Sequence, residues 1–342
     1  MGKNKTARKR ALLTGQSHQH ALMSLKRDRG QGAAPIPVAP IWQAAFEALL
    51  LERIGEWDPD FWCPGVLPFG ITWVDPSPYD LTIAIPRRYL PDLIRQLIPT
   101  IDYGQWHRPR DDDFEFHGVP GLRFRYENCY IVLYRPGQPA RVKIPLENET
   151  LWHKAIKIAT AEFPPGTILP WDTNPQDWHP AETYYSTVSW PARYAIEGEH
   201  YQASRLASDL LRRLPGICKP FVSHDMWFNF YGSTAAEYHI QLEWQNSQPP
   251  HAILDLILDR KFGLDVQLEL VHDQESEADC YTDQCRWVRL RSMDESGSRI
   301  DLRYLKFEPV SPPEGLFVIF EEVRQQRLEL EHKYGYPSSL VS

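Results

Sequence analysis

The stretch from Asp111 to His117 contains residue types that can bind a metal ion. If it forms a strand, Asp113, Glu115 and His117 share one face, because side chains alternate between the two faces of a strand. Two carboxylates and an imidazole form an oxygen and nitrogen set that divalent metals accept. In a loop, the same run is a solvated acidic bend, and this is the interpretation we adopt.

Two cysteines provide a second set of ligand types. Cys280 and Cys285 are separated by four residues, and His272 lies upstream. Thiolates and imidazoles bind zinc, but structural zinc sites commonly use a tighter C-x2-C spacing and need four ligands. Here only the fold could bring a fourth ligand such as His239. We therefore assign no metal site and expect no cofactor.

A third pattern surrounds Gly70, Asp75 and Asp80, followed by a predicted helix. It resembles the core of the nucleotidyltransferase fold, in which a Gly-Ser turn precedes Asp-x-Asp and two carboxylates hold Mg²⁺ between nucleotide phosphates. In this chain Ile71 follows the glycine, and Thr82 stands at the position of the second aspartate. A hydroxyl cannot replace that charge, and Asp75 could do so only if the loop folded back. The resemblance implies a nucleotidyltransferase-like protein, active or degenerate, as an alternative function.

Other enzyme signatures are absent from the sequence. There is no P-loop, Rossmann glycine fingerprint, nucleophile elbow or HExxH motif. We assign no catalytic residue and favour a protein without enzymatic activity.

A predicted β-hairpin combines cations with aromatic rings. Arg123 and Arg125 precede Tyr126, and the returning strand carries Tyr130 and Tyr134. Guanidinium groups and aromatic faces together suit single-stranded nucleic acid. Aromatic residues on strands also form cores, so the pattern has a structural interpretation as well.

Most of the excess positive charge lies at the N-terminus. Residues 1–30 hold eight basic residues against Asp28, a formal charge of +7. Because the whole chain has a formal charge of −8, residues 31–342 carry −15. A basic arm on an acidic body is typical of proteins that contact nucleic acid or another polyanion, although a solubilising tail has the same composition. The predicted nucleic-acid contacts are Lys3, Lys5, Arg8, Lys9, Arg10, Lys26, Arg27, Arg29, Arg123 and Arg125.

The arm also has the signals of two short helices. Residues 8–13 predict one helix, which Gly15 would end, and Ser17 is placed to cap a second helix. The pair is too short to be stable alone. Residues 30–40 are rich in proline and glycine and predict a linker.

One pattern in this N-terminal segment consists of Thr14, Gly15, Ser17, Ala21, Leu22, Leu25, Lys26 and the run from Gln43 to Leu50. With this pattern, about residues 8–50 resemble the N-terminal segment of poorly characterised actinobacterial proteins from plasmids and integrative elements. The resemblance implies a mobile-element setting, not a reaction.

Behind the arm, two halves show a similar order of predicted elements. The second half reads β-α-β-β-α-β, the ferredoxin-like pattern, and the first half is a looser version of it. A short echo between residues 83–89 and 188–194 suggests a duplication, although matches of this length also arise by chance. The predicted elements of the second half are a strand (183–190), a helix (200–214), two strands (226–231 and 236–244), a helix (251–262) and a strand (264–270).

We therefore predict an α+β fold with two ferredoxin-like or related α/β sandwich units behind a flexible basic arm. The predicted divisions are the arm and linker (1–40), the first unit (41–165), the second unit with extra strands (166–320) and a charged C-terminal helix and tail (321–342).

The composition of the sequence indicates in which cellular compartment to expect the protein. No apolar run reaches the roughly 20 residues of a membrane span, and the N-terminus lacks the apolar region of a signal peptide. Five cysteines, an odd number, favour a reducing compartment, so we expect a cytoplasmic protein with no membrane partner.

The predicted function is that of a non-enzymatic nucleic-acid-associated or assembly protein of a mobile element. Its expected partners are a nucleic acid, a protein, or both. A purely structural protein-interaction module is a further alternative beside the nucleotidyltransferase-like one.

Overall fold

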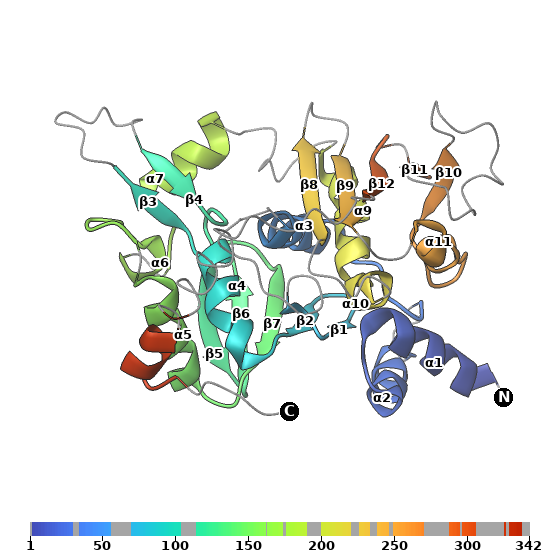
Figure 1. The fold of residues 1–342 in the computed structure, drawn as a ribbon, viewed down its shortest axis with the longest axis horizontal. Helices are drawn as coiled ribbons and strands as arrows, with labels where there is room; N and C mark the ends of the chain where they lie inside the picture. Colours follow the sequence, from blue (N-terminus) through green and yellow to red (C-terminus); the bar gives the residue numbers. More distant parts are fainter. Residues whose placement is uncertain are drawn as a thin grey trace.

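The computed structural model shows a mixed α+β protein, as the sequence predicts (Figure 1). Within the described residues, the strands form two five-stranded sheets and one two-stranded sheet. The structure describes residues 2–29, 34–55, 70–103, 114–161, 163–173, 176–189, 200–219, 226–232, 238–245, 249–269, 287–294, 296–305, 325 and 328–336.

The first unit is built on a mixed sheet of order β1-β2-β7-β6-β5. The β1–β2 hairpin leads through α4 to the antiparallel meander β5-β6-β7, whose last strand lies parallel to β2. Helix α3 precedes this sheet, α5 follows it, and β3 and β4 pair separately. The elements are α3 (Ile41–Gly55), β1 (Trp73–Pro76), β2 (Leu81–Ala84), the 3-10 helix η3 (Arg87–Tyr89), α4 (Leu90–Leu97), β3 (Thr100–Asp102), β4 (Glu115–His117), β5 (Arg123–Glu127), β6 (Tyr130–Tyr134), β7 (Arg141–Pro145) and α5 (Glu149–Ala159).

The second unit has a sheet of order β8-β9-β12-β11-β10. The β8–β9 hairpin is antiparallel, α11 follows it, and the meander β10-β11-β12 ends with a strand parallel to β9. Short helices α6 (Pro170–Thr173) and α7 (Pro180–Tyr184) and the π-helix η4 (Tyr185–Ser189) precede this unit. Its elements are α9 (His200–Leu211), α10 (Leu214–Cys218), β8 (Met226–Gly232), β9 (Tyr238–Gln245), α11 (His251–Ile257), β10 (Val266–Glu269), β11 (Trp287–Ser292) and β12 (Arg299–Leu305).

The two units share one topology. Each has a leading helix, a hairpin, a second helix and a three-stranded meander, with the last strand parallel to the second hairpin strand. This order is not βαββαβ, so the ferredoxin-like prediction is not confirmed. In particular, the strand predicted at residues 183–190 is wrong over its described part, which is helical.

The N-terminal segment forms a helical hairpin of α1 (Gly2–Thr14) and α2 (His18–Arg29). Gly15 follows α1 with a φ of +71°, a left-handed conformation that glycine adopts without strain. The Ser17 hydroxyl oxygen accepts a hydrogen bond of 3.1 Å from the His20 N–H, as an N-cap does. Both predicted caps are confirmed, although α1 begins earlier than predicted.

This helical hairpin is packed on the body and is not the flexible arm that the sequence predicted. Ala7, Ala21 and Leu25 form a buried apolar contact between the two helices. Gly216 of α10 lies so close to α1 that an added Cβ would be 2.3 Å from Leu13 Cα. In Figure 1 the blue hairpin lies against α10, next to β1.

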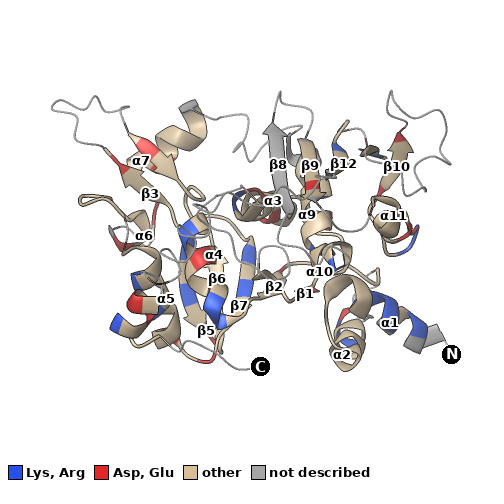
Figure 2. Ribbon diagram, in the orientation of Figure 1, with Lys and Arg blue, Asp and Glu red and all other residues tan. Residues whose placement is uncertain are grey.

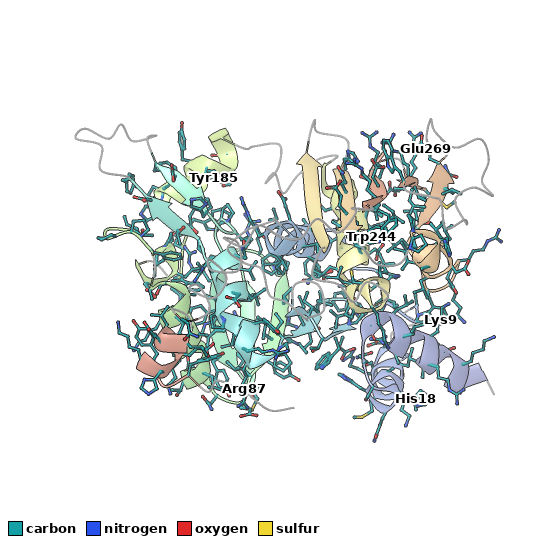
Figure 3. All side chains as sticks on the ribbon, viewed as in Figure 1. Lys9, His18, Arg87, Tyr185, Trp244 and Glu269 are labelled. Carbon is teal, nitrogen blue, oxygen red and sulfur yellow. The ribbon has the colours of Figure 1, made fainter. Side chains whose placement is uncertain are left out.

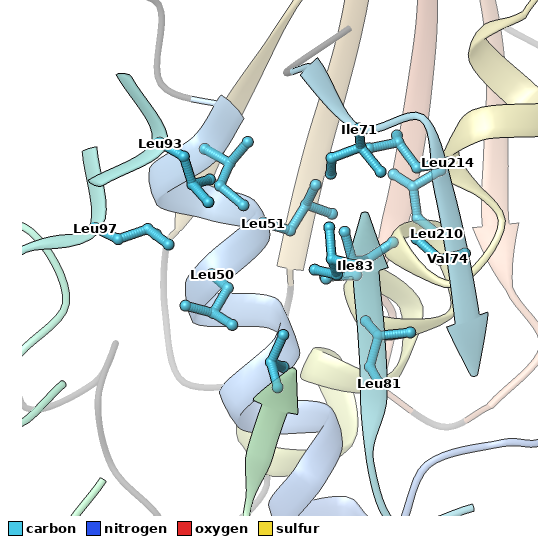
Figure 4. Packing of buried hydrophobic residues seen from close by; sticks show 14 of the residues in the cluster. Leu50, Leu51, Ile71, Val74, Leu81, Ile83, Leu93, Leu97, Leu210 and Leu214 are labelled. Carbon is cyan, nitrogen blue, oxygen red and sulfur yellow. The ribbon is translucent and has the colours of Figure 1, made fainter. Parts of the chain in front are cut away.

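One cluster of buried apolar side chains includes residues from both units. Its centre is the packing of α3 against α9, with Leu51 on the side of α3 that faces Ile83 of β2, and Leu50 on the side that faces Leu93 and Leu97 of α4 (Figure 4). The two leading helices of the duplicated topology are therefore also the elements that join the units.

A buried ion pair lies inside this helix contact. Glu47 of α3 and Arg212, which directly follows α9, have no exposed side-chain surface. Arg212 Nη2 lies 2.6 Å from Glu47 Oε1 and its Nε donates to Oε2 at 2.7 Å. Its Nη1 donates to the carbonyl oxygens of Pro37 and Ser77 at 2.7 and 2.8 Å. The guanidinium thus ties three segments of chain together.

Candidate nucleic-acid interface

Arg10 on α1 is the centre of a buried charge cluster. Its side chain is fully buried, although the sequence predicted it as a phosphate contact. Nη1 donates to Asp28 Oδ2 at 3.0 Å, and Nη2 donates to Asp75 Oδ1 at 2.9 Å. The carbonyl oxygens of Pro35 and Pro76 accept further bonds of 2.8 Å each. Arg10 therefore fastens the hairpin to β1 and is not presented to a ligand.

Arg27 and His20 of α2 complete the cluster. Arg27 Nη1 donates to Asp75 Oδ2 at 2.8 Å, and its Nε donates to Asp28 Oδ1 at 2.8 Å. His20 Nε2 lies 3.4 Å from Asp75 Oδ2, and its ring meets the Trp73 ring edge-on. Asp75 is thus held by several side chains of the hairpin.

These contacts set the ionisation of Asp75. Burial by itself would raise the pKa of this carboxyl group, but hydrogen bonds and charges from Arg27 and Arg10 outweigh burial and hold its pKa below 3.8. A carboxyl whose pKa is depressed by folding stabilises the folded state above its unfolded pKa, and this contribution is lost as the pH falls through the folded pKa. Docking of the hairpin should therefore weaken in acid.

We expect the amide NMR signals of α1 and α2 to report undocking as the pH is lowered through the depressed pKa of Asp75. The control is Asp75→Asn, which lacks the titrating group and should show weakened docking already at neutral pH. Hairpin signals that titrate identically in both proteins would contradict this account.

Of the ten predicted phosphate contacts, three are exposed on the hairpin without an ion-pair partner among the described residues. They are Lys5 and Arg8, one turn apart on α1, and Lys26 on α2. Lys9 is paired with Asp259 at 3.0 Å, on the side of α1 that faces the second unit (Figure 3). For Lys3 and Arg29, only the helical backbone is described. In the ribbon of Figure 2, Lys and Arg residues of α1 are blue, and blue and red segments also occur on other elements.

The two strand arginines are also occupied. Arg123 is buried, and its Nη2 lies 2.8 Å from Glu182 Oε2, while its Nη1 donates to Oε1 at 3.1 Å. Its placement corrects the prediction, because a phosphate could reach this group only by displacing Glu182. Arg125 is half-exposed, is paired with Glu127 and lies over the Tyr134 ring at 4.7 Å. The two arginines of the predicted cation-and-aromatic hairpin therefore make internal contacts.

The nucleotidyltransferase resemblance can be compared with this geometry. The β1–β2 hairpin places Asp75 opposite Thr82, the residue that stands where the second carboxylate would be. However, Asp75 is neutralised by the two arginines of the helical hairpin. Asp80 receives Lys143 Nζ at 2.6 Å and the Ser77 hydroxyl at 2.8 Å. Both carboxylates thus have cationic partners where Mg²⁺ would bind.

No group of three or more potential metal ligands comes together among the residues that the structure describes. Glu115 and His117 lie on β4, 3.9 Å apart, and are exposed, whereas Asp113 is outside the described residues. Cys280, Cys285 and His272 are outside them as well. His239, which only the fold could have brought to these thiols, contacts Asp301 at 2.9 Å.

Sequence reasoning missed the carboxylates that hold the hairpin. Asp28 counted only as one negative charge in the arm, and Asp75 only as a stand-in metal ligand. A usable signal was present: an aspartate inside a run of cations, on a helix that needs a docking surface, indicates an internal ion pair.

Comparison with family models, with curated proteins and with solved structures found no significant match to this chain. Over the described residues, no helix combines the length and apolar character needed to cross a membrane.

Proposed function

We propose that this protein is a non-enzymatic, nucleic-acid-associated protein whose docked N-terminal hairpin contacts phosphate through Lys5, Arg8 and Lys26. One observation carries the proposal. These three cations project from the hairpin without a carboxylate partner among the described residues, while the neighbouring arginines fix its position. The mobile-element setting implied by the N-terminal resemblance is compatible with this role.

The arginines that fix the hairpin and the cations exposed on it bind anions in different ways, for a physical reason. Arg10 and Arg27 form hydrogen-bonded pairs with carboxylates, as the guanidinium fork favours. Exposed cations instead bind phosphates largely by releasing condensed counterions, which needs no buried geometry. A docked hairpin also holds its exposed cations in one arrangement before binding, so less conformational entropy is lost on association.

The triple variant Lys5→Gln, Arg8→Gln, Lys26→Gln is expected to bind oligonucleotides more weakly at every salt concentration. The slope of log affinity against log salt should fall by about 2 to 3, since each lost phosphate contact removes about 0.7 for a single strand and 0.9 for a duplex. Fluorescence anisotropy with single-stranded and duplex probes measures both values.

The matched control is Lys157→Gln, Arg205→Gln, Lys333→Gln. It removes the same net charge from exposed positions on other elements. An equal loss in both triple variants would reduce the effect to bulk charge, and an unchanged slope in the hairpin variant would overturn the proposal.

A protein-interaction role is the second candidate, because the same hairpin exposes Leu12 and Met23, with 42% and 64% of their surface accessible. Absence of oligonucleotide binding by the intact chain would favour this candidate. The nucleotidyltransferase-like role is not favoured, since Asp75 and Asp80 are both neutralised by cations.

A further inference from the structure

The sheet of the second unit has one apolar and one polar face. Along β9, β11 and β12, alternate residues such as Ile240, Leu290 and Ile300 are fully buried in the core. The residues between them form what we call the polar face. It consists of His239, Gln241 and Glu243 on β9, Arg299, Asp301 and Arg303 on β12, and Trp287, Arg289 and Arg291 on β11. In Figure 3, Trp244 marks β9 and Glu269 marks the edge strand β10.

Two rows of this face contain neutralised arginines. Arg289 donates from Nε and Nη2 to the two oxygens of Asp301 at 2.7 and 2.9 Å. Arg303 Nη1 lies 2.8 Å from Glu243 Oε1 in the next row. Each of these arginines therefore has a carboxylate from a neighbouring strand.

The third row lacks such a carboxylate. The strand register places Arg291 directly opposite Arg299, and Arg299 beside His239. Like charges directly opposite on neighbouring strands repel each other. Within the described part of the chain, neither arginine has an ion pair, and the buried Nε of Arg299 has no acceptor. His239 contacts Asp301, a carboxylate that Arg289 already holds.

The first unit provides an internal reference for this row. We align the parallel pair β2–β7 of the first unit with the parallel pair β9–β12 of the second unit, so that Val142 corresponds to Ile300. In this alignment Arg141 corresponds to Arg299, and Asp80 corresponds to His239. In the first unit, Asp80 lies 3.7 Å from Arg141 and partly neutralises it. The second unit has an imidazole at the position of that carboxylate. The same framework therefore contains a charge pair in the first unit and, as far as the described residues go, a cation without a carboxylate partner in the second.

We propose that the polar face of the second sheet binds a phosphate group between Arg291 and Arg299, with His239 at its edge. Two guanidinium groups offer planar forks of N–H donors, which match phosphate oxygens in bidentate geometry. A dianion between them would relieve the repulsion along the row and give the buried Arg299 Nε an acceptor. This site is separate from the hairpin cations and does not rest on the proposed function.

The experiment titrates the full chain with inorganic phosphate at constant ionic strength. It follows the arginine side-chain Nε–Hε signals by NMR and the heat of binding by calorimetry. We expect one saturable site, with affinity reduced about tenfold or more in Arg299→Gln and in Arg291→Gln, since a hydrogen bond to a charged group is lost. Arg260→Gln removes an exposed arginine elsewhere and should leave the affinity unchanged.

Two further arms identify the source of the phosphate. A nucleoside monophosphate and a short oligonucleotide are titrated into the hairpin triple variant, so that failure of the hairpin proposal does not affect the result. Tighter binding of the monophosphate assigns a small phosphate monoester, and tighter binding of the oligonucleotide assigns a nucleic-acid backbone. Absence of saturable binding to the intact chain, or equal affinities in the intact chain and both arginine variants, would overturn the site.

Discussion

Arg10→Met is expected to destabilise the docked hairpin by about 3–5 kcal/mol, because removing one partner of a buried charge pair leaves the other uncompensated. Asp28 and Asp75 would then share the partly exposed Arg27 as their arginine partner, with His20 beside Asp75. The carbonyl oxygens of Pro35 and Pro76 would also lose a donor. Native-state hydrogen exchange of α1 and α2 measures this loss, and urea unfolding shows whether it spreads to the body.

The matched control is Arg8→Met, on the same helix but exposed, which should change stability by less than about 0.5 kcal/mol. A second check adds Asp75→Asn to Arg10→Met. This double variant should recover part of the loss, since the uncompensated carboxylate is removed. Hairpin protection that is equal in Arg10→Met and in the unaltered protein would show that the cluster does not hold the hairpin.

Arg212→Met is expected to destabilise the whole protein by about 3–5 kcal/mol. Glu47 would remain buried in the α3–α9 contact without the guanidinium, keeping the neutral donors it already has, the Ser208 hydroxyl at 2.6 Å and Gln43 Nε2 at 2.8 Å. Ordinary domains have only about 5–15 kcal/mol of stability, so we expect a large fall in the urea midpoint. Because the pair lies between the leading helices of both units, their unfolding should shift together.

Arg205→Met is the control, because Arg205 is exposed on α9. The double variant Glu47→Gln, Arg212→Met should be more stable than Arg212→Met alone, since no charge is left buried. An Arg212→Met protein that unfolds at the original urea concentration would refute the assigned role of the ion pair.

The sequence predicted local features of the N-terminal segment well and its location poorly. The caps at Gly15 and Ser17 depend on neighbouring residues, so short-range patterns were sufficient. Docking depends on Arg10 meeting Asp75, which is 65 positions away in the chain. A basic run has the same composition whether its cations face solvent or a buried carboxylate. Charge alone therefore led to the prediction of a flexible arm.

The missed helices α7 and η4 show how a long-range contact overrides local propensity. Residues 183–189 are rich in threonine and tyrosine, which favour strands. The helix begins instead with Pro180 at its first position and a capping box, in which Glu182 accepts from the His179 N–H at 2.8 Å. The same carboxylate holds Arg123. The partner of this helical segment is Arg123 on β5, which is too far away in the sequence for a local pattern to include it.

The duplication was suggested by a sequence echo that does not mark equivalent positions. Residues 83–89 run from β2 into η3, before α4, whereas Val188 lies in η4, ahead of α9. In the shared topology, α9 corresponds to α3. The repeated framework is therefore visible in strand order, because alternating apolar positions can be filled by many different sequences.

The buried arginines Arg10 and Arg212 also determine how well an external anion can compete with Asp75 for the arginines of the hairpin. Arg10 and Arg212 each bind one carbonyl of residues 35–37 and one of residues 76–77, so the connection between hairpin and body is fastened at both segments. Asp75 is consequently presented to Arg10 and Arg27 at the effective concentration of a short tether, which is in the millimolar range or above. A polyanion at micromolar concentration, with a similar affinity for these arginines, would therefore compete poorly with Asp75. A nucleic acid would therefore bind to a hairpin that is already docked. Arg10 and Arg27 would keep their contacts with Asp75 during binding.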